Sequence, residues 1–142
     1  MMENEIKKKI LLVDDETDML AVNSAILESY GYEILSAKDG MEALATINRS
    51  VPDLILLDLM IPGIDGYQIC GILKHDKRYQ KIPIIIVSAR FSEQDQKLAK
   101  EVGADDYLTK PFEPKTLLAK ITALLTDGKN QEPKLANEYR NL

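Results

Sequence analysis

The chain is organised around the stretch Pro52-Asp-Leu-Ile-Leu-Leu-Asp-Leu-Met-Ile-Pro-Gly-Ile-Asp-Gly66. Leu54–Leu57 is a short apolar run with the length and composition of a strand that is buried on both faces. The run ends in one ionisable residue, Asp58, and two turn signals follow it, Pro62-Gly63 and Asp65-Gly66. A carboxylate at the mouth of a loop is poorly placed for stability and well placed for chemistry. Asp58 is therefore the first candidate functional residue.

The composition favours one globular domain and argues against several functions. The chain has 142 residues, 45% of them hydrophobic, which is enough for a core. Its net charge of -5 argues against direct binding of nucleic acids or membrane surfaces, because phosphate backbones and anionic lipids attract basic faces. No apolar run has transmembrane length, and no signal-peptide pattern begins at Met1. The single Cys70 is consistent with a reducing compartment, so we expect a cytoplasmic protein with Cys70 buried on a helix.

Four more short segments predict strands, and each of the five strands is followed by a helical pattern. The expected strands are residues 10–13, 33–37, 54–57, 84–87 and 106–109. Continuous rather than alternating apolar strands indicate a parallel sheet that is covered by helices on both faces. The size and the alternation predict an α/β fold of the flavodoxin-like, doubly wound type, with five parallel strands in the order 2-1-3-4-5.

Each helix is expected to bury one apolar stripe. The predicted inward residues are Met19, Val22 and Ile26 in the first helix, flanked by Leu20 and Leu27; Met41, Leu44 and Ala45 in the second, with Ile47 beside them; Leu98, Ala99 and Val102 in the fourth; and Leu117, Ile121 and Leu124 in the fifth. Asp39 and Ser92 are expected to cap helices, and Gly31 and Gly103 to end them.

The expected domain covers residues 9–125, after a lead-in at 1–8 and before a polar tail or linker at 126–142. Asp127-Gly128 and Pro133 are expected to break structure in that tail. Its apolar residues Leu135, Tyr139 and Leu142 have helical spacing, which leaves a short docking helix as the alternative to a disordered tail or a linker.

In the predicted topology, the loops after strands 1, 3, 4 and 5 converge on one rim. They bring together Asp14, Asp15, Asp58, Ser88 and Lys110. Clustered carboxylates repel one another and need a counter-charge. Mg²⁺ can supply it, because it takes oxygen ligands and favours one or two carboxylates plus a phosphate. An aspartate beside Mg²⁺ can act as a nucleophile toward a phosphoryl group. Lys110 supplies a point charge for one phosphoryl oxygen, and the hydroxyl of Ser88 can serve another.

These residues also carry a family resemblance. Val13-Asp-Asp-Glu16, the stretch Leu57–Gly66, Ser88-Ala89 and Gly103-Ala-Asp-Asp-Tyr-Leu-Thr-Lys-Pro-Phe112 resemble the receiver domain of bacterial two-component response regulators over about residues 8 to 125. The resemblance implies that Asp58 accepts a phosphoryl group from a sensor histidine kinase or a phosphotransfer protein. It also implies a signalling phosphoacceptor with at most weak self-dephosphorylation, not an enzyme.

The resemblance further assigns roles to individual residues. Asp15 and Asp58 are implied to ligate Mg²⁺ directly, Asp14 through water, and Met60 through its backbone carbonyl. Ser88 and Lys110 are implied to contact the phosphoryl group. Ser88 and Tyr107 match the family's switch residues, and Lys110-Pro111 matches its cis peptide bond.

The predicted output surface is the face formed by residues 92–125, which is expected to change when Tyr107 turns inward. The segment from Gly103 to Leu125 is similar to the receivers of DNA-binding transcriptional regulators, without their DNA-binding domain. Asp106 and Lys120 fall where that class places an intermolecular ion pair. Gln96 and Thr116 are uncharged where the class often has a second pair, so the sequence leaves open whether the partner is a second copy or another protein.

Two other functions compete for the same residues. A phosphatase that forms an aspartyl phosphate generally needs an acid two residues after the nucleophile, and Met60 stands there. A flavin-binding module would need a loop rich in Ser, Thr or Gly after the first strand, where this chain has Asp14-Asp15-Glu16.

Overall fold

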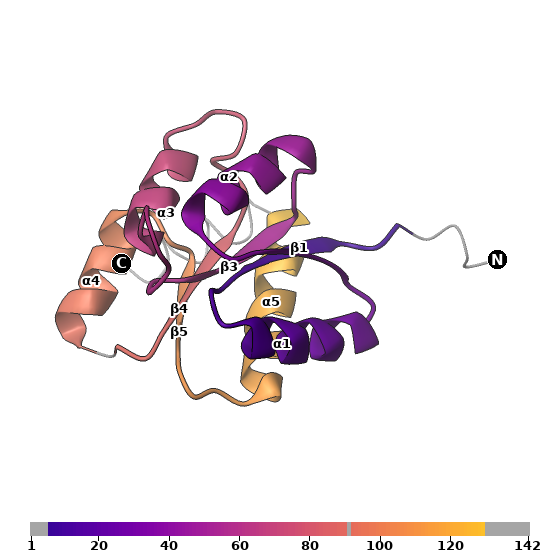
Figure 1. The fold of residues 1–142 in the computed structure, drawn as a ribbon. Helices are drawn as coiled ribbons and strands as arrows, with labels where there is room; N and C mark the ends of the chain where they lie inside the picture. Colours follow the sequence, from indigo (N-terminus) through magenta and orange to yellow (C-terminus); the bar gives the residue numbers. More distant parts are fainter. Residues whose placement is uncertain (1–5, 91, 130–142) are drawn as a thin grey trace.

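A computed structural model describes residues 6–90 and 92–129, in which five parallel strands alternate with five helices (Figure 1). The elements in chain order are β1 (Lys9–Val13), α1 (Thr17–Ser29), β2 (Glu33–Ala37), α2 (Gly40–Arg49), β3 (Leu54–Asp58), α3 (Gly66–Lys74), β4 (Ile84–Ser88), α4 (Glu93–Glu101), β5 (Asp106–Thr109) and α5 (Pro114–Lys129). The strand order is β2-β1-β3-β4-β5, and every neighbouring pair is parallel. This confirms the predicted flavodoxin-like α/β fold.

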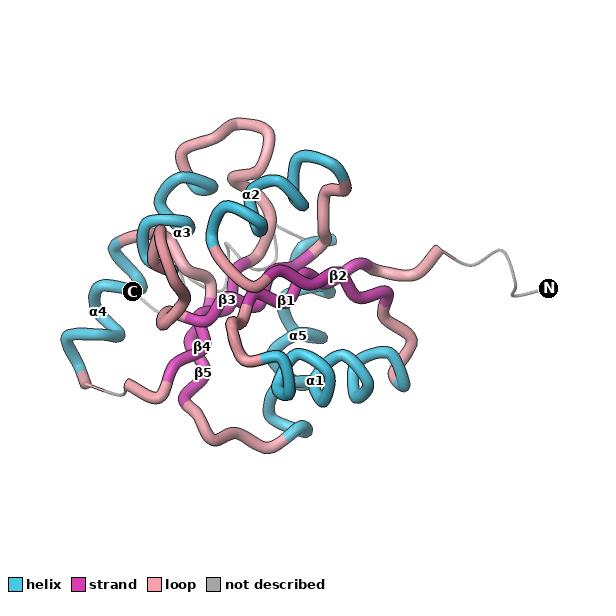
Figure 2. The backbone as a smooth tube through the Cα atoms, in the orientation of Figure 1, coloured by secondary structure: helices cyan, strands magenta, loops and turns pink. Residues whose placement is uncertain are grey.

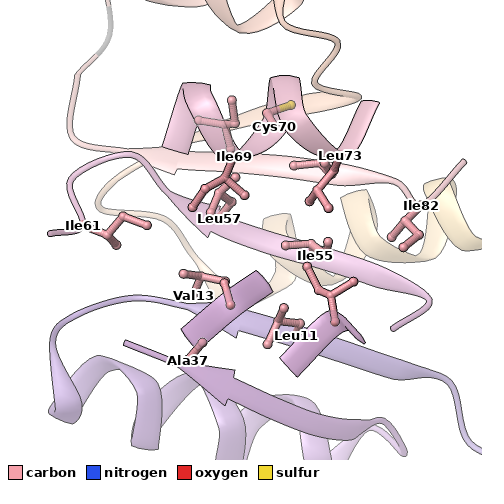
Figure 3. Close-up of a cluster of buried hydrophobic side chains, with 14 of the residues drawn as sticks. Leu11, Val13, Ala37, Ile55, Leu57, Ile61, Ile69, Cys70, Leu73 and Ile82 are labelled. Carbon is pink, nitrogen blue, oxygen red and sulfur yellow. The ribbon is translucent and has the colours of Figure 1, made fainter. Parts of the chain in front are cut away.

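The sheet lies between two helical layers, with α1 and α5 on one face and α2, α3 and α4 on the other (Figures 1 and 2). Successive residues of a strand point to opposite faces, so each strand contributes to both layers. In β3, for example, Ile55 and Leu57 pack toward α3, whereas Leu54 and Leu56 pack toward α1 and α5. Figure 3 shows Ile55 and Leu57 with Cys70 of α3 in the first of these clusters.

Local side-chain bonds fix the helix ends as the sequence predicts. Asp39 caps α2 by accepting a hydrogen bond from the backbone N–H of Glu42, and Ser92 caps α4 in the same way. Gly31 and Gly103 follow α1 and α4 with φ of 95° and 93°, a left-handed conformation in which side chains are rarely found. Cys70 is fully buried on α3, as expected.

The predicted inward faces of α1 and α2 are wrong in part: Leu20, Leu27 and Ile47 are buried as predicted, but the other residues of the two predicted stripes are not. In α1 the buried residues are Leu20 and Leu27, and Val22 is 52% exposed. In α2 the buried side is built from smaller residues, with Ala43 packed inward and Met41 67% exposed. A helix turns about 100° per residue, so neighbouring apolar stripes have similar spacing and only the sheet decides which one is buried.

The remaining inward residues of α2 are Thr46 and Ile47, while Leu44 is half-buried and Ala45 exposed. In α4 only Ala99 is buried, Val102 is half-buried and Leu98 is exposed. In α5 the predicted stripe of Leu117, Ile121 and Leu124 is buried, so that prediction is confirmed.

The last helix is longer than predicted, because α5 continues through Asp127-Gly128 to Lys129. One glycine costs a helix only about 1 kcal/mol, which a helix already packed along its length tolerates. The expected break at Pro133 and the docking-helix pattern of Leu135, Tyr139 and Leu142 lie outside the described residues. Among the described helices, none has both the length and the apolar character needed to cross a membrane.

Candidate phosphoacceptor site

The register of β1 and β3 places two carboxylates side by side. Val13 pairs with Leu57, so the residues that follow them, Asp14 and Asp58, sit next to each other at the carboxyl ends of adjacent strands. Both are buried, with 8% and 5% of their surface exposed. Two buried acids at this spacing need a positive partner, because burial and mutual repulsion both disfavour the charged forms.

Lys110 supplies that charge from the end of β5. Its Nζ lies 2.6 Å from Asp58 Oδ2 and 3.5 Å from Asp14 Oδ2, and Glu16 Oε1 is 3.9 Å away. Burial alone would lower the pKa of Lys110, but the hydrogen bond and negative charge of Asp58, with a further contribution from Asp14, outweigh it and raise the pKa. The ammonium group is therefore held in its charged form between the two acids.

The second oxygen of each acid is bound by the main chain. Asp58 Oδ1 accepts a hydrogen bond from Met60 N at 2.8 Å, and Asp14 Oδ1 accepts one from Glu16 N at 2.9 Å. These bonds hold both carboxylates in place and direct their other oxygens toward Lys110. The turns after β1 and β3 thus orient the site.

Helix α3 begins very close to the phosphoacceptor candidate. A Cβ atom at Gly66 would lie 3.0 Å from both Asp58 O and Leu59 Cα, so a larger residue would push the helix away. Asp65 closes this end of the loop with a capping box to Gln68.

The two predicted switch residues meet at one backbone position after β4. Ser88 is buried, and its Oγ accepts a hydrogen bond from Arg90 N at 3.0 Å. The hydroxyl of Tyr107 donates to Arg90 O at 2.7 Å. Ser88 is also hydrogen-bonded to the residue that follows β5, because Lys110 N donates to Ser88 O at 2.8 Å. The sequence gives no signal for Arg90, because its contacts with Ser88 and Tyr107 are made by main-chain atoms that every residue has.

Not every predicted site residue joins the cluster. Asp14, Asp58 and Lys110 contact one another, whereas Asp15 is exposed and has no hydrogen bond or ion pair with the described part of the chain. Glu16, which the sequence did not single out as a site residue, is the third acid within 4 Å of the lysine. Its place two residues after Asp14 could have suggested it. The Lys110–Pro111 bond is cis, as the resemblance implied.

The donors at the rim fit Mg²⁺ in chemistry. Across residues 6–90 and 92–129, no group of three or more His, Cys, Asp or Glu side chains is arranged to hold a metal. Asp14 and Asp58 nevertheless each direct one carboxylate oxygen at Lys110 Nζ, and Asp58 also accepts a hydrogen bond from the backbone N–H of Met60. Two carboxylates suit an ion that completes its shell with water and phosphate oxygens.

The pair predicted to link two molecules is formed within this chain. Lys120 Nζ lies 3.1 Å from each carboxylate oxygen of Asp106. The pair joins β5 to α5 on the predicted output face.

Comparisons with known proteins agree with this geometry. The protein-family model described as "Response regulator receiver domain" matches residues 10–122. The alkaline phosphatase synthesis transcriptional regulatory protein PhoP of Bacillus subtilis is 40% identical over 136 residues, which cover 96% of this chain and 55% of PhoP. The phosphate regulon transcriptional regulatory protein PhoB of Pseudomonas aeruginosa is 44% identical over 120 residues, which cover 84% of this chain and 52% of PhoB. The chain thus spans about half the length of these relatives.

Solved structures show the same likeness. A CheY-like receiver domain protein from Methanospirillum hungatei superimposes with a TM-score of 0.83 at 32% identity, covering 89% of this chain and 99% of that one. The BeF3-activated receiver domain of RstA from Klebsiella pneumoniae gives 0.77 at 32% identity, covering 83% and 98%. The family of these receivers generally uses Mg²⁺ and is typically a non-enzymatic phosphoacceptor. On its strand order, its acidic rim and these matches, the chain belongs to the response regulator receiver domain family of two-component systems.

Proposed function

We propose that Asp58 accepts a phosphoryl group from a phosphohistidine of a sensor histidine kinase or a phosphotransfer protein. The observation that carries this proposal is the buried Asp58 carboxylate, 2.6 Å from Lys110 Nζ and next to Asp14. A buried acid held at a loop mouth beside a fixed cation has what phosphoryl transfer requires, namely a positioned nucleophile and a charge for the phosphoryl oxygens.

In the transfer step, an Asp58 oxygen attacks phosphorus and forms the P–O bond of an aspartyl phosphate. The P–N bond to the donor imidazole breaks at the same centre, and the electron pair stays with the imidazole. Lys110 moves its contact from Asp58 Oδ2 to a phosphoryl oxygen, and the Ser88 hydroxyl donates to another. Slow attack by water on phosphorus later releases inorganic phosphate and restores the carboxylate.

The metal of this step is proposed to be Mg²⁺. Asp58, Asp15 and the backbone carbonyl of Met60 would hold it directly, and Asp14 through water. When bound, the ion neutralises the phosphoryl oxygens and the acidic rim. Glu16 approaches the same lysine and adds to the negative charge that a cation would meet.

The phosphoryl group is proposed to act through Ser88 and Tyr107. Both side chains are hydrogen-bonded to the backbone of Arg90 in this structure, and Tyr107 is half-buried against the cluster that α2, α3 and α4 cover. When Ser88 turns to the phosphoryl group it releases Arg90 N, and Tyr107 can turn inward into the space behind it. The face built from α4, β5 and α5 then changes for a downstream protein or a second copy of the chain.

The proposal describes a signalling protein, with at most weak self-dephosphorylation and no direct contact with nucleic acid or membrane. The kinase donor and the single reduced Cys70 are consistent with the cytoplasm. A phosphatase is the rival, and it lacks support because Met60 has no proton to donate to a leaving group.

The proposal is tested with acetyl phosphate, a small acylphosphate donor, and intact-mass spectrometry. With Mg²⁺ the protein should gain the mass of one phosphoryl group, and Asp58→Asn should abolish the gain. Asp65→Asn is the matched control, because Asn caps α3 as well as Asp does and the acid lies in the same loop. A gain that persists in Asp58→Asn would refute the site.

A further inference from the structure

The first residue of α2 is packed tightly against the loop that follows the phosphoacceptor candidate. A Cβ atom at Gly40 would lie 2.9 Å from both Ile64 O and Ile69 Cδ1, and 3.1 Å from Ile64 Cβ. Distances of 2.9 Å are shorter than Cβ atoms tolerate, and Ile64 O belongs to the main chain and cannot turn aside as a side chain could. Gly40 is buried, so only a glycine lets α2 begin this close to the loop between β3 and α3.

The loop between β3 and α3 connects this contact to the phosphoacceptor carboxylate. Met60 N donates to Asp58 Oδ1 at 2.8 Å, so the loop backbone orients the carboxylate. Leu59 and Ile61, on either side of Met60, are buried in the cluster that α2, α3 and α4 cover, where Figure 3 shows Ile61. The loop therefore has little room to absorb a shift of Ile64 without moving the groups that hold Asp58.

The β2–α2 connection, residues 37–40, also holds the second buried acid. Asp14 N donates to Ala37 O at 3.0 Å, so one end of the connection fixes the main chain of Asp14. Lys38 N donates to Glu42 Oε1 at 2.8 Å, which ties the connection to the first turn of α2. The β2–α2 connection therefore contacts both of the chain segments that carry the buried acids.

We infer that Gly40 is a positioning residue, which lets the β2–α2 connection set the placement of Asp58 relative to Asp14. The inference rests on the proposed function of Asp58 and on the proposed Mg²⁺ at the rim. Mg²⁺ demands near-ideal placement of its ligands at about 2.0–2.1 Å, so a small displacement of the loop that carries them weakens binding. Gly40 has no side chain to offer the metal, and it acts through the backbone of Ile64 and Met60.

The test is Gly40→Ala, the smallest substitution that places an atom in this contact. Groups that orient metal ligands without binding the metal change its affinity by about 10- to 100-fold. Gly40→Ala should therefore bind Mg²⁺ about tenfold more weakly than the wild type. The titration is followed through the ¹H–¹⁵N signals of Met60 and Glu16, whose amides donate to Asp58 and Asp14. Without Mg²⁺, the Met60 signal of Gly40→Ala should already differ from that of the wild type.

The matched control is Gly103→Ala. A Cβ atom at Gly103 would lie 2.9 Å from Lys74 Cγ, and the φ of 93° at this position strains any side chain. Gly103 precedes β5, at the edge of the sheet opposite to the buried acids. Gly103→Ala should therefore lower the free energy of unfolding and leave the Mg²⁺ affinity and the Met60 signal unchanged.

A second variant, Glu42→Ala, covers the case in which Gly40→Ala does not fold. It removes the hydrogen bond from Lys38 N and adds no atom to the contact, so the fold should persist. Loosening the β2–α2 connection by one exposed hydrogen bond should weaken Mg²⁺ binding by about twofold.

The outcomes separate the inference from the proposed function. Wild-type Mg²⁺ affinity in Gly40→Ala, or in Glu42→Ala where Gly40→Ala does not fold, would show that the contact serves packing only and that the inference is wrong. Equal losses of affinity in Gly40→Ala and Gly103→Ala would trace the effect to lower stability and would also overturn it. If the wild type binds no Mg²⁺, it is the proposed function that fails.

Discussion

At the scale of single residues, the proposed function depends on Lys110, whose ammonium group lies between two buried acids. Lys110 contacts both buried acids at the ends of β1 and β3, and the raised pKa keeps it charged there. Charge that is already in place costs nothing to reorganise when a phosphoryl group arrives. The lysine therefore has a catalytic role in the proposed transfer, besides balancing the acids.

Replacing Lys110 by Ala should slow phosphorylation by acetyl phosphate about 100-fold, since removing one preorganised charge at a transfer site costs about that much. Mg²⁺ binding should survive, because the acids remain. The rate is measured by intact-mass spectrometry over time, with Lys115→Ala as control, an exposed lysine of the first turn of α5. Unchanged rates in Lys110→Ala would remove the lysine from the mechanism.

The buried thiol of Cys70 gives a prediction for how the free energy of unfolding depends on pH. Burial raises the pKa of the Cys70 thiol from 9.0 to about 11. Between these values the unfolded thiol has lost its proton and the folded thiol has kept it, so the free energy of unfolding falls as pH rises. Below pH 9 this contribution is fully present, and above pH 11 it is lost.

Urea unfolding of the wild type and Cys70→Ala at about pH 8 to 11 measures this contribution. Tyrosines and lysines affect both proteins alike, so the wild type should lose more stability across the window, by on the order of 2 kcal/mol. Equal losses would show that the thiol titrates normally in the fold.

At the scale of elements, the sequence predicts where strands and helices lie better than which side of a helix is buried. The β2 and β5 bounds match the predicted ranges, and the bounds of β1, β3 and β4 differ from them by one residue at one end. The turn and helix-ending residues around each segment limit where a strand can begin and end. The inward sides of α1 and α2 agree with the prediction only in part, since Leu20, Leu27 and Ile47 are buried but Val22 and Met41 are exposed. Met41 is apolar and correctly spaced, yet it faces solvent, since Ala43 allows α2 a closer approach to the sheet.

The same limit applies to the site. The sequence predicts that Asp14, Asp58 and Lys110 meet, because parallel strands end at the same edge of the sheet and bring the residues that follow them close together. It does not separate Asp15 from Glu16, because the direction of a side chain in a turn depends on bonds such as Glu16 N to Asp14 Oδ1.

The tight start of α3 gives a prediction for that helix. Gly66→Ala should destabilise the fold by about 1–3 kcal/mol, because its Cβ would press on Asp58 O and on Leu59. A Cβ at Gly71, in the same helix, would meet no atom within 4 Å, so Gly71→Ala should stabilise the fold by about 0.5–1 kcal/mol. Urea unfolding compares the two, and shifts of the same sign would contradict the close approach.

At the scale of the whole molecule, the strand order links the site to the output face. The order β2-β1-β3-β4-β5 puts the two acids at the ends of β1 and β3, with Ser88 at the end of the neighbouring strand β4 and Lys110 directly after the edge strand β5. Those two strands lead directly into α4 and α5. A change at the rim therefore has a short physical route to the predicted output face, where Asp106 and Lys120 already pair within the chain.

Mg²⁺ should raise the melting temperature, because it binds the acidic rim of the folded protein and not the unfolded chain. The gain is about 2.7 kcal/mol at a concentration about 100 times the dissociation constant. Asp15→Asn should reduce this gain, while Asp18→Asn, an exposed acid in the first turn of α1, should not. An equal gain in all three proteins would count against the proposed metal ligands.

The most direct test of the central claim is to locate the phosphoryl group. Borohydride reduces an aspartyl phosphate to homoserine, so treatment after phosphorylation marks the acceptor residue for peptide mass spectrometry. The account predicts homoserine at position 58 and at no other aspartate. Homoserine at Asp14 or Asp15, or at no position in a protein that has gained a phosphoryl group, would contradict it.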